Sequence, residues 1–205
     1  MSMTLAKYAW NYGLTCKFLK AIGCFERFNS QRNRKAEYET VIEYLDEGRQ
    51  PSGVRRVIRE WGIGGAYWEI INPSFNFYGR WLYGEYANDY LILANAEPHA
   101  QILWNAGYQA IYIPFDDSPW KELYRIGAER FKRIYTYGAS NIDTGGTLFE
   151  NKVRRLDMIT DIGEIFADDY NADMTKFVYQ MKRAFWQAEQ AKTRNWNEFT
   201  TEAAQ

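Results

Sequence analysis

The chain has 205 residues, of which 46% are hydrophobic and 18% are aromatic. Enough apolar surface is therefore present to offset the entropy of ordering the chain, which excludes a wholly disordered protein. Its 25 basic and 26 acidic side chains nearly cancel, giving a formal net charge of −1. The sequence thus lacks the global positive field that drives non-specific binding to nucleic acids or membranes. Any nucleic-acid surface has to come from local clustering of basic residues.

The cysteine content and the hydropathy of the sequence indicate the cellular compartment of the protein. The two cysteines, Cys16 and Cys24, are too few for a disulfide framework or a structural zinc site. No segment approaches the roughly 18 to 20 apolar residues that span a bilayer, and the first residues lack the apolar run of a signal peptide. We therefore expect a soluble protein without membrane association in the reducing cytoplasm, which for a viral protein is the host cytoplasm.

The N-terminal region is predicted to be mainly helical. Residues 1–29 have a helical apolar pattern that is broken around Gly13 and Gly23. Residues 35–47 and 53–61 repeat apolar side chains at three- and four-residue spacing and stop at glycines. This spacing predicts two amphipathic helices. The following residues, 66–86, are rich in β-favouring aromatic and branched side chains, which predicts short antiparallel strands.

From Asp89 onward strand and helix patterns alternate, which indicates an α/β fold with a parallel or mixed sheet covered by helices. Strands are predicted at residues 90–93, 110–113, 134–137 and 164–166, and helices at 99–106, 120–131, 147–158 and 174–190. We predict three regions along the chain: an N-terminal helical and short-strand region at residues 1–87, an α/β domain at 88–190 and a polar, frayed tail at 191–205.

Acidic residues follow three predicted strands of the α/β region. Glu97 lies within LILANAEPHAQILWNAGYQAIYIPF (residues 91–115), Asp143 within the turn NIDTGG (141–146), and Asp169 begins DYN (169–171). In order and spacing these segments resemble the motifs of the primase-type Toprim domain, the acidic metal-binding fold of primases and topoisomerases. Since ligands of parallel sheets bind at the carboxyl ends of the strands, the resemblance implies that the three acids meet at one edge.

The resemblance also implies roles for these residues. Glu97 corresponds to the acid or base of catalysis, and Asp143 and Asp169 correspond to ligands of Mg²⁺. Three positions depart from the family pattern, which has glycine, aspartate and aspartate where this chain has Pro98, Gln101 and Asn141. Amides lack the charge that makes carboxylates good Mg²⁺ ligands. The site is therefore expected to bind Mg²⁺ weakly or not at all. If they bind no metal, Glu97, Asp143 and Asp169 are ordinary loop or helix-capping residues.

Basic and aromatic residues form a second candidate site. Arg55, Arg56 and Arg59 share one face of the helix predicted at 53–61, and Arg80 lies among aromatic residues. Such a surface can follow the phosphates of DNA or RNA and stack on bases. The alternative is a solvated helix face above an aromatic core.

Three functional hypotheses follow. The first is a nucleic-acid-associated protein of viral or mobile-element replication, with a primase-type Toprim-like domain that is catalytically degenerate. The second is a non-enzymatic assembly or interaction protein, such as a virion component or an inhibitor of a host factor, which binds a protein partner through its aromatic surface. The third is an active Mg²⁺-dependent nucleotidyltransferase or nuclease.

Overall fold

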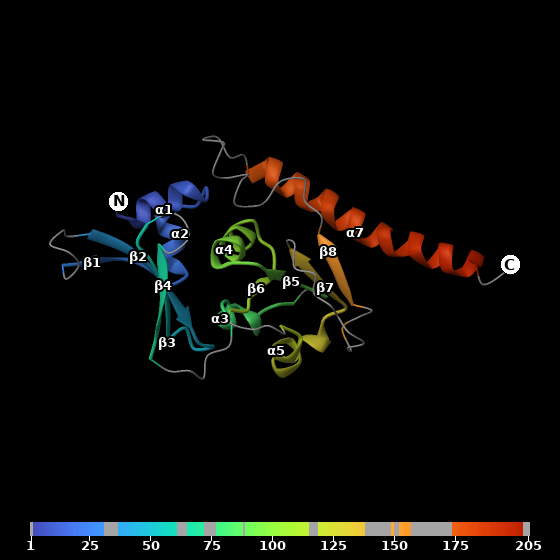
Figure 1. Ribbon diagram of the computed structural model, residues 1–205, viewed down its shortest axis with the longest axis horizontal. Coiled ribbons are helices and arrows are strands. Elements are labelled where there is room, and N and C mark those ends of the chain that lie inside the picture. The colour runs from blue at the N-terminus through green and yellow to red at the C-terminus, as the bar shows by residue number, and fades with distance from the viewer. Residues whose placement is uncertain are drawn as a thin grey trace.

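The computed structural model contains two sheets and a long C-terminal helix (Figure 1). An antiparallel sheet is formed by the N-terminal part of the chain, and a parallel sheet covered by helices follows it. The fold class predicted from the sequence is therefore confirmed. The structure describes residues 2–30, 37–60, 65–71, 77–87, 89–114, 119–137, 149, 152–156 and 174–202.

Two short helices precede the antiparallel sheet. Both begin after a threonine whose hydroxyl accepts a hydrogen bond from the backbone: Thr4 from the Lys7 amide and Thr15 from the Phe18 amide. The sheet has the strand order β1-β2-β3-β4, with every neighbouring pair antiparallel. The elements are α1 (Leu5–Asn11), α2 (Cys16–Ala21), β1 (Cys24–Asn29), β2 (Glu37–Leu45), β3 (Pro51–Ile58) and β4 (Ala66–Ile70).

The two helices predicted at residues 35–47 and 53–61 are wrong, since these segments form β2 and β3. A hairpin turn joins the strands, and the Asp46 carboxylate accepts hydrogen bonds from the Gly48 and Gln50 amides within it. Residues 24–29, expected to be helical, form β1 instead. The strands expected within residues 66–86 include β4, but α3 (Arg80–Tyr83) is a short helix.

The parallel sheet has the order β6-β5-β7-β8. Its strands confirm the predictions at residues 90–93, 110–113 and 134–137. The helix predicted at 147–158 is wrong because this segment contains β8, and the strand predicted at 164–166 lies outside the described residues. The elements are β5 (Tyr90–Ala94), α4 (Glu97–Asn105), β6 (Ala110–Tyr112), α5 (Pro119–Arg125), η1 (Ala128–Arg130), β7 (Arg133–Tyr137), β8 (Val153–Leu156) and α7 (Met174–Glu202).

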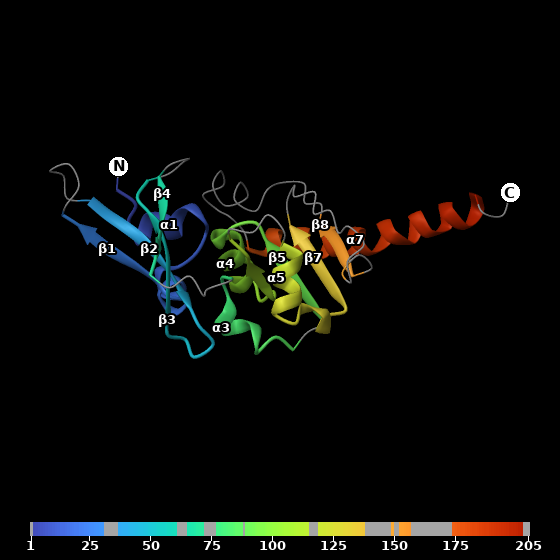
Figure 2. The ribbon, with the colours of Figure 1, turned by 60° about the horizontal axis from the view of Figure 1, so that its bottom comes forward.

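Helices cover both faces of the parallel sheet (Figure 2). On one face, Ile92 and Tyr135 belong to the same apolar cluster as side chains of α4 and α7. On the other face, Leu91 and Ile134 pack in a second cluster with Leu123 of α5. The C-terminal helix continues through Glu202, past the end of the sheet in Figures 1 and 2, where the sequence predicted a frayed tail.

The two sheets share one apolar core. The cluster that contains Ile92 extends to Cys24, Ile42 and Val54 of the antiparallel sheet. One face of this sheet therefore packs toward α1, α2 and α4, while its opposite face carries charged side chains. Within the part of the chain that the structure describes, no helix has the length and apolar content to cross a membrane.

Candidate functional site

Glu97 lies at the carboxyl edge of the parallel sheet. It is the first residue of α4, three positions after β5 ends at Ala94. In the strand order β6-β5-β7-β8, the chain passes from β5 to β6 on one side and then returns to β7 on the other side of β5. The direction of the connections therefore switches between β5 and β7. The carboxyl ends of these two strands lie together because Leu93 pairs with Thr136 in parallel register. Such switch points are the usual ligand sites of open α/β sheets.

The Glu97 carboxylate is buried against the antiparallel sheet. It is 6% exposed, and the Tyr44 hydroxyl of β2 donates a hydrogen bond of 2.7 Å to its Oε1 atom. Burial raises the pKa of Glu97 because it disfavours the charged form, while the Tyr44 hydrogen bond and the positive charge of Arg56 oppose this effect. The carboxyl group therefore keeps its proton at a higher pH than an exposed glutamate, which suits a proton donor or acceptor.

Gln101, one turn further along α4, is fully buried and uses both ends of its amide. The Tyr8 hydroxyl donates to its Oε1 atom at 2.7 Å. Its Nε2 atom donates to the Tyr78 hydroxyl at 2.9 Å and faces the Cys24 sulfur at 3.4 Å. The residue at the expected position of a family aspartate therefore ties α1, β1 and the segment before α3 to α4. No sequence pattern indicates this contact, because Tyr8 and Gln101 are 93 residues apart.

The basic cluster predicted on one helix face is divided between the two faces of a strand. Since side chains alternate along β3, Arg55 and Arg56 point to opposite sides of the sheet. The Arg56 guanidinium lies over the Trp68 ring at 4.8 Å, on the face toward α4. The prediction of a shared helix face is wrong because the segment is a strand.

The opposite face of the sheet carries a charged ladder, which consists of Arg27, Glu39, Glu43, Arg55, Arg59 and Glu69. Arg55 contacts Glu43 and Arg59 contacts Glu39, each at 2.6 Å. Glu39 also binds Arg27 at 2.9 Å. Three positive and three negative groups leave the ladder without net charge, so Arg55 and Arg59 present little positive potential to a phosphate.

The remaining predicted residues lie elsewhere. Arg80 is in α3 and forms an ion pair of 3.1 Å with the exposed Glu47. Asp143 and Asp169 lie outside the described residues. The structure therefore brings Glu97 and Arg56 to the same junction between the sheets, while Arg55, Arg59 and Arg80 point elsewhere.

The described side chains at this edge do not by themselves fit Mg²⁺. Among the described residues, no three His, Cys, Asp or Glu side chains come together to hold a metal ion. One Glu97 oxygen accepts from Tyr44, and the Gln101 oxygen accepts from Tyr8. Mg²⁺ requires near-octahedral oxygen ligands, with carboxylates and several waters. A buried carboxyl group with a raised pKa and an amide oxygen that already accepts a hydrogen bond are poor ligands for Mg²⁺.

The fold is similar to that of solved structures, whereas the sequence matches no known family. No protein-family model and no curated protein matches this chain. The DnaG primase catalytic domain bound to ssDNA aligns with a TM-score of 0.60 and 7% identity, over 86% of this chain and 72% of that one. The DnaG catalytic core gives 0.59 and 8%, over 86% and 71%. At this identity the similarity establishes a primase-like fold and nothing finer.

Proposed function

We propose that this chain is a nucleic-acid-associated protein built on a primase-type Toprim-like fold. The observation that supports it most strongly is the similarity, over 86% of the chain, to a primase catalytic domain solved with single-stranded DNA. The junction between the two sheets, where the charge of Arg56 acts on Glu97, is the first place to seek a nucleic-acid contact. We therefore take single-stranded DNA as the first ligand to test.

Among the four arginines proposed from the sequence, Arg56 is best placed for this role. No ion pair joins it to a carboxylate within the described residues, whereas Arg55, Arg59 and Arg80 each have an acidic partner. Its guanidinium lies over Trp68, and its charge acts on Glu97 at the carboxyl edge. A guanidinium stacked on an indole can contact a phosphate while the ring offers a face to a base. Arg55, Arg59 and Arg80 remain proposed as secondary contacts.

Salt-dependent binding tests this proposal. Fluorescence anisotropy with a labelled single-stranded oligonucleotide, at salt between about 50 and 200 mM, should show affinity that falls as salt rises. Arg56→Gln should flatten the slope of log affinity against log salt by about 0.7, the value for one lost contact to a single-stranded phosphate. Arg183→Gln, which removes an exposed arginine from α7, should leave the slope unchanged. Absence of binding at low salt would overturn the proposal.

A second candidate function is nucleotidyl transfer or nuclease chemistry, and the position of Glu97 at the switch point favours it. In this proposal Glu97 exchanges a proton with the reacting group, and Asp143 and Asp169 are ligands of Mg²⁺. Because the described side chains at the edge do not fit the metal, we expect Mg²⁺ to bind weakly or not at all. Calorimetric titration of Mg²⁺ into the parent and into an Asp143→Asn, Asp169→Asn variant tests the ligands. Measurable Mg²⁺ binding with equal affinity in both proteins would contradict their assignment.

The interaction-protein alternative rests on exposed aromatic residues of α7. Tyr179 and Trp186 are 69% and 65% exposed, and their seven-residue spacing places them on the same side of the helix. Large exposed aromatics are enriched at protein interfaces. Failure of the DNA-binding test would make this face the next surface to examine.

A further inference from the structure

Basic and aromatic side chains alternate along the exposed side of α7. This α7 stripe consists of Lys176, Tyr179, Arg183 and Trp186. Their three- and four-residue spacing places the four side chains on one side of a helix. The other side of α7 packs into the apolar core through Phe177 and Met181, each 0% exposed. The stripe is therefore not needed to hold α7 on the sheet.

The two rings of the α7 stripe are accessible to a partner. Tyr179 and Trp186 are 69% and 65% exposed, and Lys176 and Arg183 are exposed as well. In Figures 1 and 2, α7 runs along the outside of the molecule and past the end of the parallel sheet. Because most of the surface of each ring is in contact with water, covering the rings would contribute favourably to binding.

The one acidic residue in this part of α7 is used elsewhere. Within residues 174–190 the sequence contains three basic residues and a single acid, Glu189. The Glu189 carboxylate faces the sheet, where the Arg133 Nε atom and the Tyr135 hydroxyl donate hydrogen bonds to it at 3.2 and 2.8 Å. No acidic side chain therefore belongs to the stripe.

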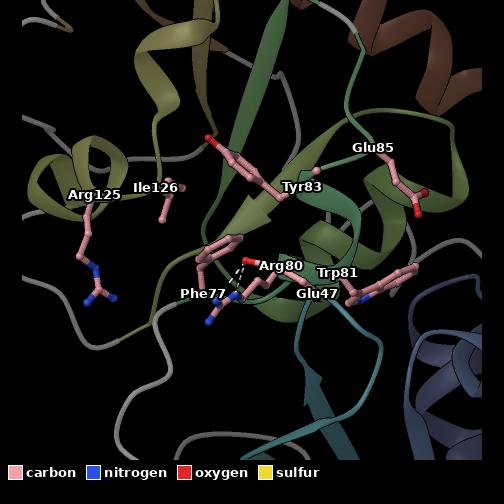
Figure 3. Close-up of a pocket in the computed structure, with 9 residues that line it drawn as sticks. Glu47, Phe77, Arg80, Trp81, Tyr83, Glu85, Arg125 and Ile126 are labelled. Carbon is pink, nitrogen blue, oxygen red and sulfur yellow. Dashed lines mark hydrogen bonds and ion pairs between the residues drawn. The ribbon is translucent and has the colours of Figure 1, made fainter.

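The positive charges of the stripe are not offset by ion pairs. Among the described residues, no carboxylate lies within ion-pair distance of Lys176, Arg183 or the neighbouring Lys182. The contrast is with arginines such as Arg80 of α3, which pairs with Glu47 at 3.1 Å (Figure 3). An exposed surface with uncompensated positive charge attracts an anionic partner.

The spacing of the rings indicates the kind of anionic partner. Tyr179 and Trp186 are two helical turns apart, which is about 10 Å along the axis. A second helix lying along α7 repeats its own side chains at the same interval. Successive bases of a single strand stack on successive rings, whereas Arg183 separates these two. A second copy of this chain would bring like charges together, which is unfavourable.

We propose that the α7 stripe is a docking surface for an acidic amphipathic helix of another protein. Apolar side chains seven residues apart on that helix pack on Tyr179 and Trp186, and carboxylates beside them pair with Lys176 and Arg183. A contact along two helical turns is smaller than a standard interface, so the complex is transient. The proposal rests on the interaction-protein alternative alone, and its failure would leave the DNA-binding proposal standing.

Fluorescence anisotropy with two labelled synthetic helical peptides tests this surface on the full chain. The first peptide carries leucine every seven residues, flanked by glutamates on the same face, and the second has the same composition scattered around the helix. The first should bind more tightly, with an affinity that falls as salt rises. Trp186→Ala should weaken its binding about tenfold, as for an aromatic residue central to an interface. Arg183→Gln should weaken it about threefold, as for an exposed ion pair.

Matched controls remove the same kinds of side chain from other helices. Trp10 of α1 is 63% exposed, and Arg125 of α5 pairs with Glu122 at 2.7 Å. Trp10→Ala and Arg125→Gln should leave the affinity for the first peptide unchanged. Urea unfolding of each variant checks that its stability is that of the parent, as expected for exposed positions.

The proposal is overturned by absence of binding of the first peptide, or by equal affinity in the parent, Trp186→Ala and Arg183→Gln. Two other results would also overturn it, by giving the stripe a different occupant. Self-association in sedimentation experiments that Trp186→Ala abolishes would identify a second copy of the chain. Binding of a single-stranded oligonucleotide that Trp186→Ala weakens would identify a nucleic acid.

Discussion

Replacing Gln101 by aspartate tests whether this position belongs to the core or to a metal site. The family resemblance places a carboxylate here, whereas the structure shows a fully buried amide that binds Tyr8 and Tyr78. Aspartate is one methylene shorter and cannot donate when ionised. We therefore expect Gln101→Asp to destabilise the fold rather than to complete a site for Mg²⁺.

The expected loss follows from the contacts. Leaving the two buried tyrosine hydroxyls without their partner costs about 1 to 3 kcal/mol each. The missing methylene adds about 1 kcal/mol, so the total is about 3 to 7 kcal/mol. Burial should also raise the pKa of the new carboxyl, as it does for Glu97. The loss should therefore be smallest below the unfolded pKa of about 3.9 and increase as pH rises through the folded value.

Urea denaturation at several pH values, with and without Mg²⁺, measures these quantities. For a loss of about 4 kcal/mol and a slope of about 2 kcal/mol/M, the midpoint should fall by about 2 M. Gln187→Asp, at an exposed position of the α7 helix, controls for the lower helix propensity of aspartate. A Gln101→Asp variant that is as stable as the parent, or that Mg²⁺ stabilises more than the parent, would contradict a core role for Gln101.

Three further predictions concern charge and hydrogen bonding. Because burial raises the pKa of Glu97, the carboxyl group contributes fully to the stability of the fold below about pH 4.5, and this contribution is lost as pH rises through the pKa of the folded state. The melting temperature of Glu97→Gln should therefore rise relative to that of the parent as pH increases. Parallel profiles of melting temperature against pH would contradict this prediction. Burial opposes ionisation of Glu39, but hydrogen bonds from its arginine partners outweigh this effect and lower the pKa of Glu39. Glu39→Gln should therefore lower the free energy of unfolding, measured in urea at neutral pH, by about 3 kcal/mol. The difference from the parent should shrink as pH falls through the lowered pKa. Tyr135→Phe removes the hydroxyl that donates to Glu189 at 2.8 Å and should cost about 1 kcal/mol in the same assay, with no loss if the bond does not form in solution.

The β5 and β6 strands of the parallel sheet were predictable because they are buried on both faces, whereas the β8 segment was predicted to be a helix. Such strands appear in sequence as short continuous apolar runs, and residues 90–93 and 110–113 have this form between helix patterns. The β2 strand is also buried on both faces, as the adjacent Val41 and Ile42 are each 0% exposed. Here Glu39 and Glu43 are buried through their arginine partners, so the apolar spacing that remains coincides with that of a helix. The β-branched run of residues 40–42 was the available signal for a strand.

The position of Glu97 at the carboxyl edge of the sheet was predictable because Glu97 follows the apolar strand β5 by three residues. The position of a residue so close to a strand depends only on the local direction of the chain. The environment of Glu97 was not predictable, because Tyr44 is 53 residues away. The partners of Gln101 likewise depend on how the two sheets meet. Arg55 and Arg56 lie on opposite faces of the sheet because side chains alternate along β3. This could be inferred only from the knowledge that the segment is a strand.

The shared core of the two sheets has a consequence for fragments of this protein. Phe77 and Tyr83 pack in the core of the parallel sheet, and Tyr78 pairs with the end of β6, although all three precede the boundary predicted near residue 88. Cutting the chain there would remove these side chains and leave Glu97 without Tyr44. A recombinant piece that begins at residue 88 should therefore aggregate or remain partly unfolded, and the two halves should melt together in a single transition.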